Sequence, residues 1–147
     1  MTLIDDRLSA QRLSRGVCRA LAALGYATLT EFPLASGRRV DVIAVNGAGE
    51  TVIVEIKTCT ADYRADRKWS EYLDYCDVFY FAVPVDFPLA LMPADCGLMV
   101  ADDYSAEILR RIAPQPMNGS RRRAQTLRLA VAAMQRLGRI IDPEAGA

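Results

Sequence analysis

Two carboxylates and a lysine in the first half of the chain are the residues whose types and spacing suit chemistry. Asp41 lies in a stretch rich in Val and Ile at residues 39–45, and Glu55 and Lys57 lie in a second such stretch at residues 51–57. Side chains alternate between the two faces of a strand, so Glu55 and Lys57 should share one face. Charged groups on one face of an apolar central strand are costly to bury unless they serve each other or a ligand. This face is therefore a candidate site.

The loop between these two strands decides whether Asp41 joins the same face. Residues 46–50 read Asn-Gly-Ala-Gly-Glu, and Gly49 suits the left-handed position that a three-residue loop requires. Residue 46 would then pair with residue 50, and Asp41 would lie opposite Glu55 with their Cβ atoms roughly 5 Å apart. A four-residue loop would instead place Asp41 opposite Val54 on the other face, and the placement of the glycines disfavours that register.

Two carboxylates this close repel each other unless a cation lies between them. Their hard oxygen atoms suit Mg²⁺ or Mn²⁺, and the backbone carbonyl of Ile56 is expected as an additional ligand. Such a metal makes its water a better nucleophile, and Lys57 can hold that water or offset charge on a phosphate. We therefore expect Asp41, Glu55 and Lys57 to support phosphodiester hydrolysis. The alternative is that Glu55 and Lys57 form only an exposed surface pair.

The elements that must position these residues follow from hydrophobic periodicity. Helices are predicted at residues 5–24, 60–76 and 120–137, and strands at residues 26–34, 40–45, 51–57, 78–83, 97–101 and 106–112. The order is αβββαβ followed by ββα, which predicts an α/β fold with a mixed sheet flanked by helices. We expect a single domain over residues 1–147.

The acid, acid and lysine at these positions resemble the PD-(D/E)xK nuclease superfamily, whose restriction-endonuclease-like core is αβββαβ. More narrowly, three stretches resemble the MmcB-type DNA-repair family of bacteria: Arg-Val-Asp-Val at 39–42, Glu-Ile-Lys-Thr at 55–58, and the block at 62–83. The likeness covers about residues 4–112, the nuclease-like core, with extra C-terminal strands and a basic helix at about 120–138. It implies a Mg²⁺- or Mn²⁺-dependent endonuclease acting on DNA in repair, with Asp41, Glu55 and Lys57 as its catalytic set.

One departure from the superfamily pattern affects the metal count. Many members carry an additional glutamate in the first helix, whereas residues 10–24 contain no acid. Asp5, Asp6 or Glu31 could take that place, or the site binds a single metal. The alternative function is a catalytically weak or inactive nuclease-fold module that binds nucleic acid or a repair partner. The intact acid, acid and lysine set favours the enzyme.

Charge is unevenly distributed along a chain whose net charge is zero. Residues 1–109 have a net charge of −6 and residues 110–147 a net charge of +6. This asymmetry fits a basic DNA-binding surface beside an acidic pocket, or a basic helix that packs against an acidic body. The residues predicted to contact DNA phosphates are Arg39, Arg64, Lys68, Arg121, Arg122 and Arg123.

The last predicted helix also has an apolar seam, which allows a second reading of its arginines. The seam consists of Leu127, Ala130, Val131, Met134 and Leu137. In this reading the helix docks by its seam and its arginines are only solvated. On the preceding helix, Tyr72 could position a ligand, although core packing is the favoured interpretation for Tyr72 and for Trp69.

Composition excludes several other classes of protein. The absence of histidine excludes a Ser-His-Asp triad and any His-ligated zinc site. The four cysteines form no C-x-x-C pair, which argues against a zinc ribbon. With 52% hydrophobic residues, no apolar run long enough to span a bilayer and no signal peptide, we expect a globular cytoplasmic protein that does not engage membranes. DNA is the expected partner, and both a repair partner protein and a homodimer are compatible with the sequence.

Overall fold

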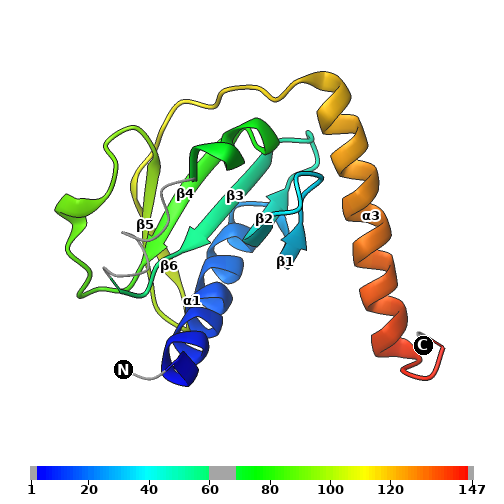
Figure 1. Ribbon diagram of the computed structural model, residues 1–147, viewed down its shortest axis with the longest axis horizontal. Coiled ribbons are helices and arrows are strands. Elements are labelled where there is room, and N and C mark those ends of the chain that lie inside the picture. The colour runs from blue at the N-terminus through cyan, green and yellow to red at the C-terminus, as the bar shows by residue number, and fades with distance from the viewer. Residues whose placement is uncertain (1–2, 60–68, 146–147) are drawn as a thin grey trace.

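A mixed six-stranded sheet, with its strands in chain order, forms the centre of the fold (Figure 1). The computed structural model describes residues 3–59 and 69–145, with side chains from residue 9 onward. The strands are β1 (Ala27–Pro33), β2 (Arg39–Val45), β3 (Thr51–Ile56), β4 (Val78–Val83), β5 (Gly97–Ala101) and β6 (Ala106–Arg110). β3, β4 and β5 run parallel, whereas β1–β2, β2–β3 and β5–β6 are antiparallel pairs. The predicted α/β fold with a mixed sheet is confirmed.

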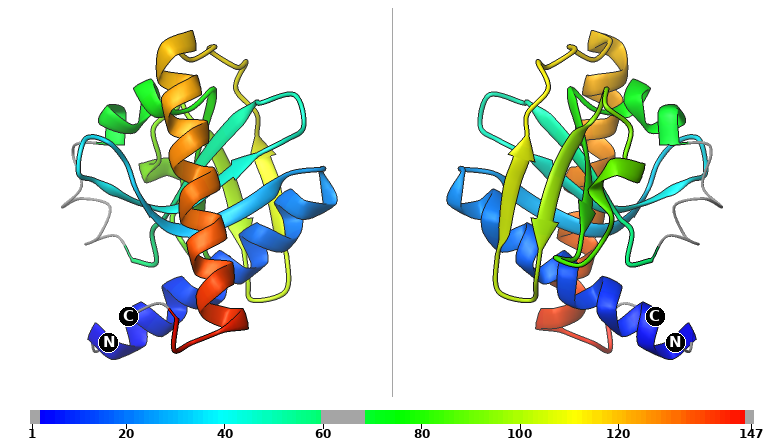
Figure 2. Two further views of the ribbon diagram at one scale, coloured as in Figure 1. Left: turned by 90° about the vertical axis from the view of Figure 1, so that its right-hand side faces the viewer. Right: turned by 90° about the vertical axis from the view of Figure 1, so that its left-hand side faces the viewer.

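Helical elements lie against the two faces of this sheet (Figures 1 and 2). They are α1 (Leu3–Ala23), the short 3₁₀ helix η1 (Trp69–Tyr75) and α3 (Gly119–Ile141); a second 3₁₀ helix, η2 (Leu89–Leu91), lies in the loop between β4 and β5. α1 packs on one face, where Leu13 and Val17 join a buried cluster with Val54 and Ala82. The alternation of apolar side chains along the strands therefore supplies a core on each side.

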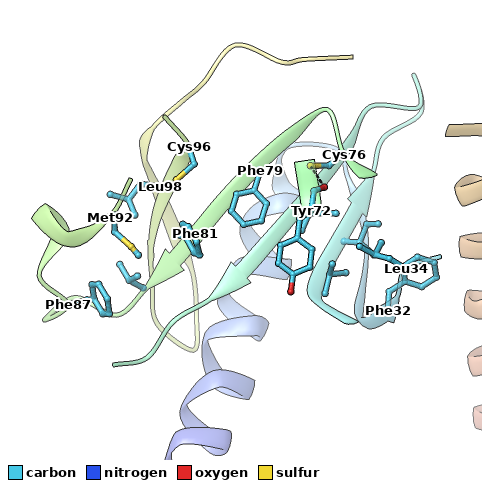
Figure 3. Packing of buried hydrophobic residues seen from close by; sticks show 14 residues of the cluster. Phe32, Leu34, Tyr72, Cys76, Phe79, Phe81, Phe87, Met92, Cys96 and Leu98 are labelled. Atoms are coloured by element: carbon cyan, nitrogen blue, oxygen red, sulfur yellow. Dashed lines mark hydrogen bonds between the residues drawn. The ribbon is translucent and has the colours of Figure 1, made fainter. Parts of the chain in front are cut away.

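The opposite face carries an aromatic core beneath η1 (Figure 3). The ring of Trp69 stacks on Phe79 with a centroid distance of 5.6 Å and meets the edge of Phe81. Tyr72 stacks on Phe79 at 5.9 Å and is buried. Such pairs stabilise a core beyond the area that they bury. Core packing, the favoured interpretation for Tyr72 and Trp69, is confirmed.

Several boundaries differ from the sequence-based expectation. The part of the predicted helix at 60–76 that is described is a 3₁₀ helix over Trp69–Tyr75, and residues 60–68 lie outside the described ranges. Leu24, the last residue of the helix predicted at 5–24, lies beyond the end of α1 at Ala23 and is 51% exposed. β6 ends at Arg110, two residues before the predicted end at residue 112. The chain then leaves the sheet, and the amide of Gln115 donates to the carbonyl of Asp77.

α3 extends four residues beyond its predicted end. Its first turn is capped by Asn118, whose side chain accepts from the amides of Ser120 and Arg121. Within residues 3–59 and 69–145, no helix is both long and apolar enough to cross a membrane.

Candidate functional site

The hairpin between β2 and β3 determines where Asp41 lies. Gly49 has a φ of 85°, the left-handed conformation expected of it, and its amide donates to the carbonyl of Asn46 over 3.0 Å. The Asn46 side chain holds the loop by accepting from the amides of Ala48 and Glu50, each over 3.0 Å. Val45 pairs with Thr51, as a three-residue loop requires. The predicted register is confirmed.

Asp41 and Glu55 occupy the first step beyond the last regular pair of this ladder, Val42 with Val54. Glu55 Oε1 accepts from the amide of Asp41 over 3.0 Å, and Asp41 Oδ2 accepts from the amide of Ile56 over 2.8 Å. The two carboxylates thus replace main-chain acceptors where β2 separates from β3. They lie on adjacent antiparallel strands, at the same end of the sheet.

Lys57 follows directly on β3, and its amide donates to the carbonyl of Ala82 over 3.0 Å. Glu55 is 5% exposed and Lys57 9% exposed. The alternative reading of these two residues as an exposed surface pair is therefore wrong. Val54 and Ile56 belong to the cluster beneath α1, so the predicted separation of charged and apolar side chains on this strand is confirmed.

The electrostatics of the site disfavour an ionised Asp41. Burial raises the pKa of Asp41 above its ordinary value of 3.8, and the negative charge of Glu31 acts in the same direction. The amide of Ile56, the charge of Lys57 and a hydrogen bond with Glu55 act in the opposite direction without cancelling the effect of burial. Additional positive charge beside Asp41 would therefore stabilise its ionised form.

Glu31 is the acid that the fold places beside this pair. In the β1–β2 ladder Thr30 pairs with Val42 and Phe32 with Val40, so Glu31 occupies the step opposite Asp41. Its backbone is left-handed, with a φ of 49°, which is rare for a residue other than glycine. Strain of this kind concentrates at functional sites. Asp5 and Asp6, the other acids considered, lie outside the residues whose side chains are described.

The donor atoms of this site fit a small divalent cation. Asp41 and Glu55 supply hard carboxylate oxygens, and the carbonyl of Ile56 leaves β3 on the same side as its amide, toward the end of β2. Among the residues whose side chains are described, no group of three or more His, Cys, Asp or Glu comes together as a metal cage. A cation here would therefore be held by two carboxylates, one carbonyl and water.

The predicted DNA-contacting residues lie in different surroundings. Arg39 is exposed at the start of β2, two residues before Asp41. Arg64 and Lys68 lie outside the described residues. Arg123 is exposed on α3, and Arg121 places its guanidinium 4.9 Å from the centre of the Tyr75 ring. Arg39 and Asp41 are alternate residues of β2, so their side chains leave the same face of the sheet.

Arg122 requires a correction. Its guanidinium binds both carboxylate oxygens of Asp77, with distances of 2.5 and 2.7 Å, and donates to the carbonyl of Gly49 over 2.7 Å. Arg122 is therefore bound within the protein, where the sequence-based prediction had it contacting phosphate. Of the two readings of the uneven charge, the packing of a basic helix against an acidic body describes this ion pair.

Two further arginines also direct α3 onto the sheet. Arg128 donates to the carbonyl of Pro33 over 2.9 Å, and Arg136 donates to the carbonyls of Thr30 and Glu31 over 2.5 and 3.0 Å. The reading in which this helix docks by its apolar seam is therefore wrong. Arginine suits these contacts because its guanidinium group carries several N–H donors that can bind the main-chain carbonyls of the edge strand β1.

Asp77 is the important residue that the sequence analysis missed. Besides Arg122, it accepts from the amides of Thr51 and Met117, over 2.7 and 2.9 Å. An acid placed directly before the buried strand Val78–Val83 was the available signal, because a buried carboxylate requires partners.

A pocket of about 430 Å³ at the carboxyl ends of β3–β5 was also missed; its lining includes Arg12, Thr58 and Asp102. Ligands of open α/β sheets commonly bind at this end of the strands.

The sequence and the fold of this chain are each similar to those of known proteins. The family model described as DNA repair protein MmcB-like matches residues 1–144. Among solved structures, the chain is similar to the SPO1766 protein of unknown function from Silicibacter pomeroyi, with 42% identity, 95% of each chain covered and a TM-score of 0.91. None of the curated proteins matches it. The chain belongs to the MmcB-like DNA repair protein family.

Proposed function

We propose that this protein is a metal-dependent nuclease of the PD-(D/E)xK type that hydrolyses phosphodiester bonds in DNA. The observation that carries the proposal is the pairing of the half-buried Asp41 with the buried Glu55 on adjacent strands, followed on β3 by the buried Lys57. Membership of a DNA repair family supports DNA as the substrate. Two carboxylates and a lysine at one end of a sheet suit hydrolysis of a phosphodiester, because this reaction develops negative charge that needs cationic support.

Within this proposal each residue has a separate role. Asp41, Glu55 and the carbonyl of Ile56 would hold Mg²⁺ or Mn²⁺. When bound, the cation supplies positive charge beside the phosphate and activates the attacking water. Lys57 adds a second positive charge, which orients the water or stabilises the phosphate oxygens. Glu31 lies one strand farther along the same row and would hold a water of the cation's outer shell.

Exposed arginines at the same end of the sheet would hold the DNA backbone. Arg39 is the nearest candidate in the chain to Asp41, and it is exposed. An arginine that neutralises one phosphate contributes to affinity without reading sequence, and its contribution weakens as salt rises. Replacing Arg39 with Ala should lower DNA affinity similarly for all sequences and reduce the salt slope by about one. Arg19, exposed on α1, provides the matched control.

A different observation favours a second function, a DNA- or partner-binding module with a vestigial site. Asp41 and Glu55 each accept a hydrogen bond from a main-chain amide of the facing strands. These bonds alone satisfy part of the hydrogen-bonding capacity of the two carboxylates and would hold the ends of β2 and β3 together. In this reading Lys57 is a counter-ion and no bond is cleaved.

Cleavage of defined DNA substrates distinguishes the two functions. The parent protein is incubated with single-stranded, nicked, flapped and mismatched DNA in Mg²⁺ or Mn²⁺. We expect cleavage by the parent and a loss of at least about a hundredfold in Asp41→Asn, which keeps an acceptor for the Ile56 amide. Asp95→Asn, an exposed acid before β5 at the opposite end of the sheet, should cut normally.

A calorimetric titration with Mn²⁺ completes this test. The parent and Asp95→Asn should bind the ion, and Asp41→Asn should not. A parent that neither binds Mn²⁺ nor cuts any of the four substrates would overturn the nuclease proposal and favour the binding module.

A further inference from the structure

The outward face of α3 carries an apolar surface that nothing in the described chain covers. Six large apolar side chains on this helix are between 46% and 77% exposed: Leu127, Val131, Met134, Leu137, Ile140 and Ile141. Scattered exposed apolar residues are ordinary, but a continuous stripe of them marks an interaction site. We call Leu127, Ala130, Met134, Leu137 and Ile141 the outer seam.

The outer seam faces away from the sheet because the other face of the helix is the one that docks. Gln125 donates to the carbonyl of Tyr75 over 2.8 Å, and Leu129 and Ala132 pack against the aromatic core. The bonds of Arg122, Arg128 and Arg136 lie on that same side. The left view of Figure 2 shows α3 lying in front of the rest of the molecule along its full length. A second helix could therefore approach the seam without obstruction from the sheet.

The spacing of the seam is that of a helix pair. Its five members follow one another at intervals of three, four, three and four residues. This is the heptad pattern whose side chains interdigitate with those of a facing helix. The flanking positions are uncharged as well: Thr126, Val131, Ala133, Gly138 and Ile140. Small residues among them would allow the two backbones to approach closely.

We infer that α3 pairs in an antiparallel manner with α3 of a second copy of this chain. In a twofold contact between two copies, the outer seam of one helix faces the same seam of the other. Because the seam carries no charge, no like charges meet at the centre of this contact. In an antiparallel helix pair, each first position of a heptad faces a fourth position of the partner helix. In this register Leu127 faces the partner's Leu137 and Ala130 faces the partner's Met134. Each large side chain at Met134 then meets a small one.

The charges at the ends of α3 select the antiparallel direction. Arg123 is exposed at the beginning of the helix, and Asp142 and Glu144 are exposed just past its end. Antiparallel pairing brings Arg123 beside the partner's Asp142 and Glu144, and it opposes the two helix dipoles favourably. Parallel pairing would instead bring the arginine-rich beginnings of both helices together. Opposite charges therefore meet at both ends of the antiparallel pair.

The seam is short, which sets the expected affinity. Fifteen residues from 127 to 141 span about 22 Å of helix. A contact between two single helices of this length belongs to the small class of protein interfaces. We therefore expect a dissociation constant in the micromolar range.

Sedimentation velocity of the full chain between about 2 and 200 µM tests the pairing. The parent should pass from monomer to dimer over this range, and Met134→Glu should remain monomeric with an unchanged circular dichroism spectrum. Val85→Glu is the matched control, because Val85 is 79% exposed and lies in the loop after β4. That variant should dimerise as the parent does.

Disulfide trapping tests the direction of pairing, in a background where Cys18 and Cys59 are replaced by Ser. Equal amounts of Leu127→Cys and Leu137→Cys should form a mixed disulfide dimer on mild oxidation, whereas Leu127→Cys alone should not. Self-linking of Leu127→Cys would overturn the antiparallel arrangement.

A parent that stays monomeric to 200 µM overturns the proposal altogether, including the case in which it instead sediments with vesicles of anionic lipid. None of these measurements uses DNA or a metal, so their outcome is independent of the proposed nuclease activity.

Discussion

Arg122 of α3 and Asp77, the residue before β4, form a two-pronged ion pair in which both carboxylate oxygens are bound. Burial by itself would raise the pKa of Asp77, but hydrogen bonds from Arg122 and from the amides of Thr51 and Met117 outweigh it and lower the pKa. One carboxylate thereby joins β3, the segment before α3 and α3 itself. This contact therefore helps to hold the beginning of α3 against the sheet.

Replacing Asp77 with Asn should destabilise the fold by about 3 kcal/mol at pH 7, because it leaves the Arg122 guanidinium without its counter-charge. The pKa of Asp77 is lower in the folded state than in the unfolded state. Its stabilisation is therefore present above the unfolded value of about 3.8 and is lost as the pH falls through the folded value. Urea unfolding at pH 7 and below pH 4 checks this, since the difference between parent and variant should shrink in acid. Arg123→Gln should change stability by less than about 0.5 kcal/mol.

Asp41→Asn should have the opposite effect and stabilise the metal-free protein at neutral pH. Burial raises the pKa of Asp41, so the folded state holds its proton more tightly than the unfolded state. The stability of the parent should therefore fall as the pH rises from about 3.8 through the folded pKa, and the variant should lack this decline. Thermal unfolding from pH 4 to 8 measures it. We expect a gain of a few degrees at pH 7, about 1 kcal/mol. Equal melting of both proteins across this range would contradict the assignment of a desolvated charge.

Added Mn²⁺ should reverse the order of these two proteins. A cation held by Asp41 and Glu55 binds the folded parent and raises its melting temperature by mass action. Asp41→Asn should show no such rise, and Asp95→Asn should respond as the parent does. A rise of the same size in Asp41→Asn would place the ion elsewhere.

Lys57→Met distinguishes a catalytic lysine from a structural counter-ion. Methionine retains much of the buried stem and removes only the charge, so the fold and the affinity for Mn²⁺ should persist. Cleavage should fall by roughly a hundredfold, the scale for losing one donor at a developing charge. If Lys57 only balances Glu55, the variant should instead lose about 1–3 kcal/mol of stability. Parallel measurements of melting temperature and of cleavage of nicked DNA separate the two roles.

Two helical glycines should respond to alanine with opposite signs. A Cβ at Gly16 would lie 1.9 Å from the carbonyl oxygen of Asp102 and 2.6 Å from that of Ser105, both main-chain atoms that cannot easily move. Gly16→Ala should therefore cost about 3 kcal/mol or more. Gly138 has nothing within 4 Å of its added Cβ, so Gly138→Ala should stabilise α3 by up to about 1 kcal/mol. Unfolding at low micromolar concentration, where the chain is monomeric, compares the two.

Much of the candidate site follows from local sequence. The position of Gly49 selects a three-residue loop, the loop selects the pairing of Val45 with Thr51, and strand periodicity then carries that register to Asp41 and Glu55. The exchange of hydrogen bonds between these carboxylates and the facing backbone was not predictable, because it depends on the separation of β2 from β3 at that step. The place of Glu31 likewise depends on its left-handed backbone within β1.

The sequence by itself determined the strands, the order of helices and strands along the chain, and the register that places Asp41 opposite Glu55. These features depend on the alternation of side chains and on turn chemistry within a few residues. It also determined that α3 is amphipathic. Only the tertiary structure decided which face of α3 meets the sheet. Helical periodicity distinguishes the faces of a helix only by their hydrophobicity, whereas the actual docking rests on three arginines whose acceptors lie 45 to 106 residues away in the chain. Long-range hydrogen bonds to main-chain carbonyls leave no periodic trace in sequence, and they turned the apolar side of the helix outward.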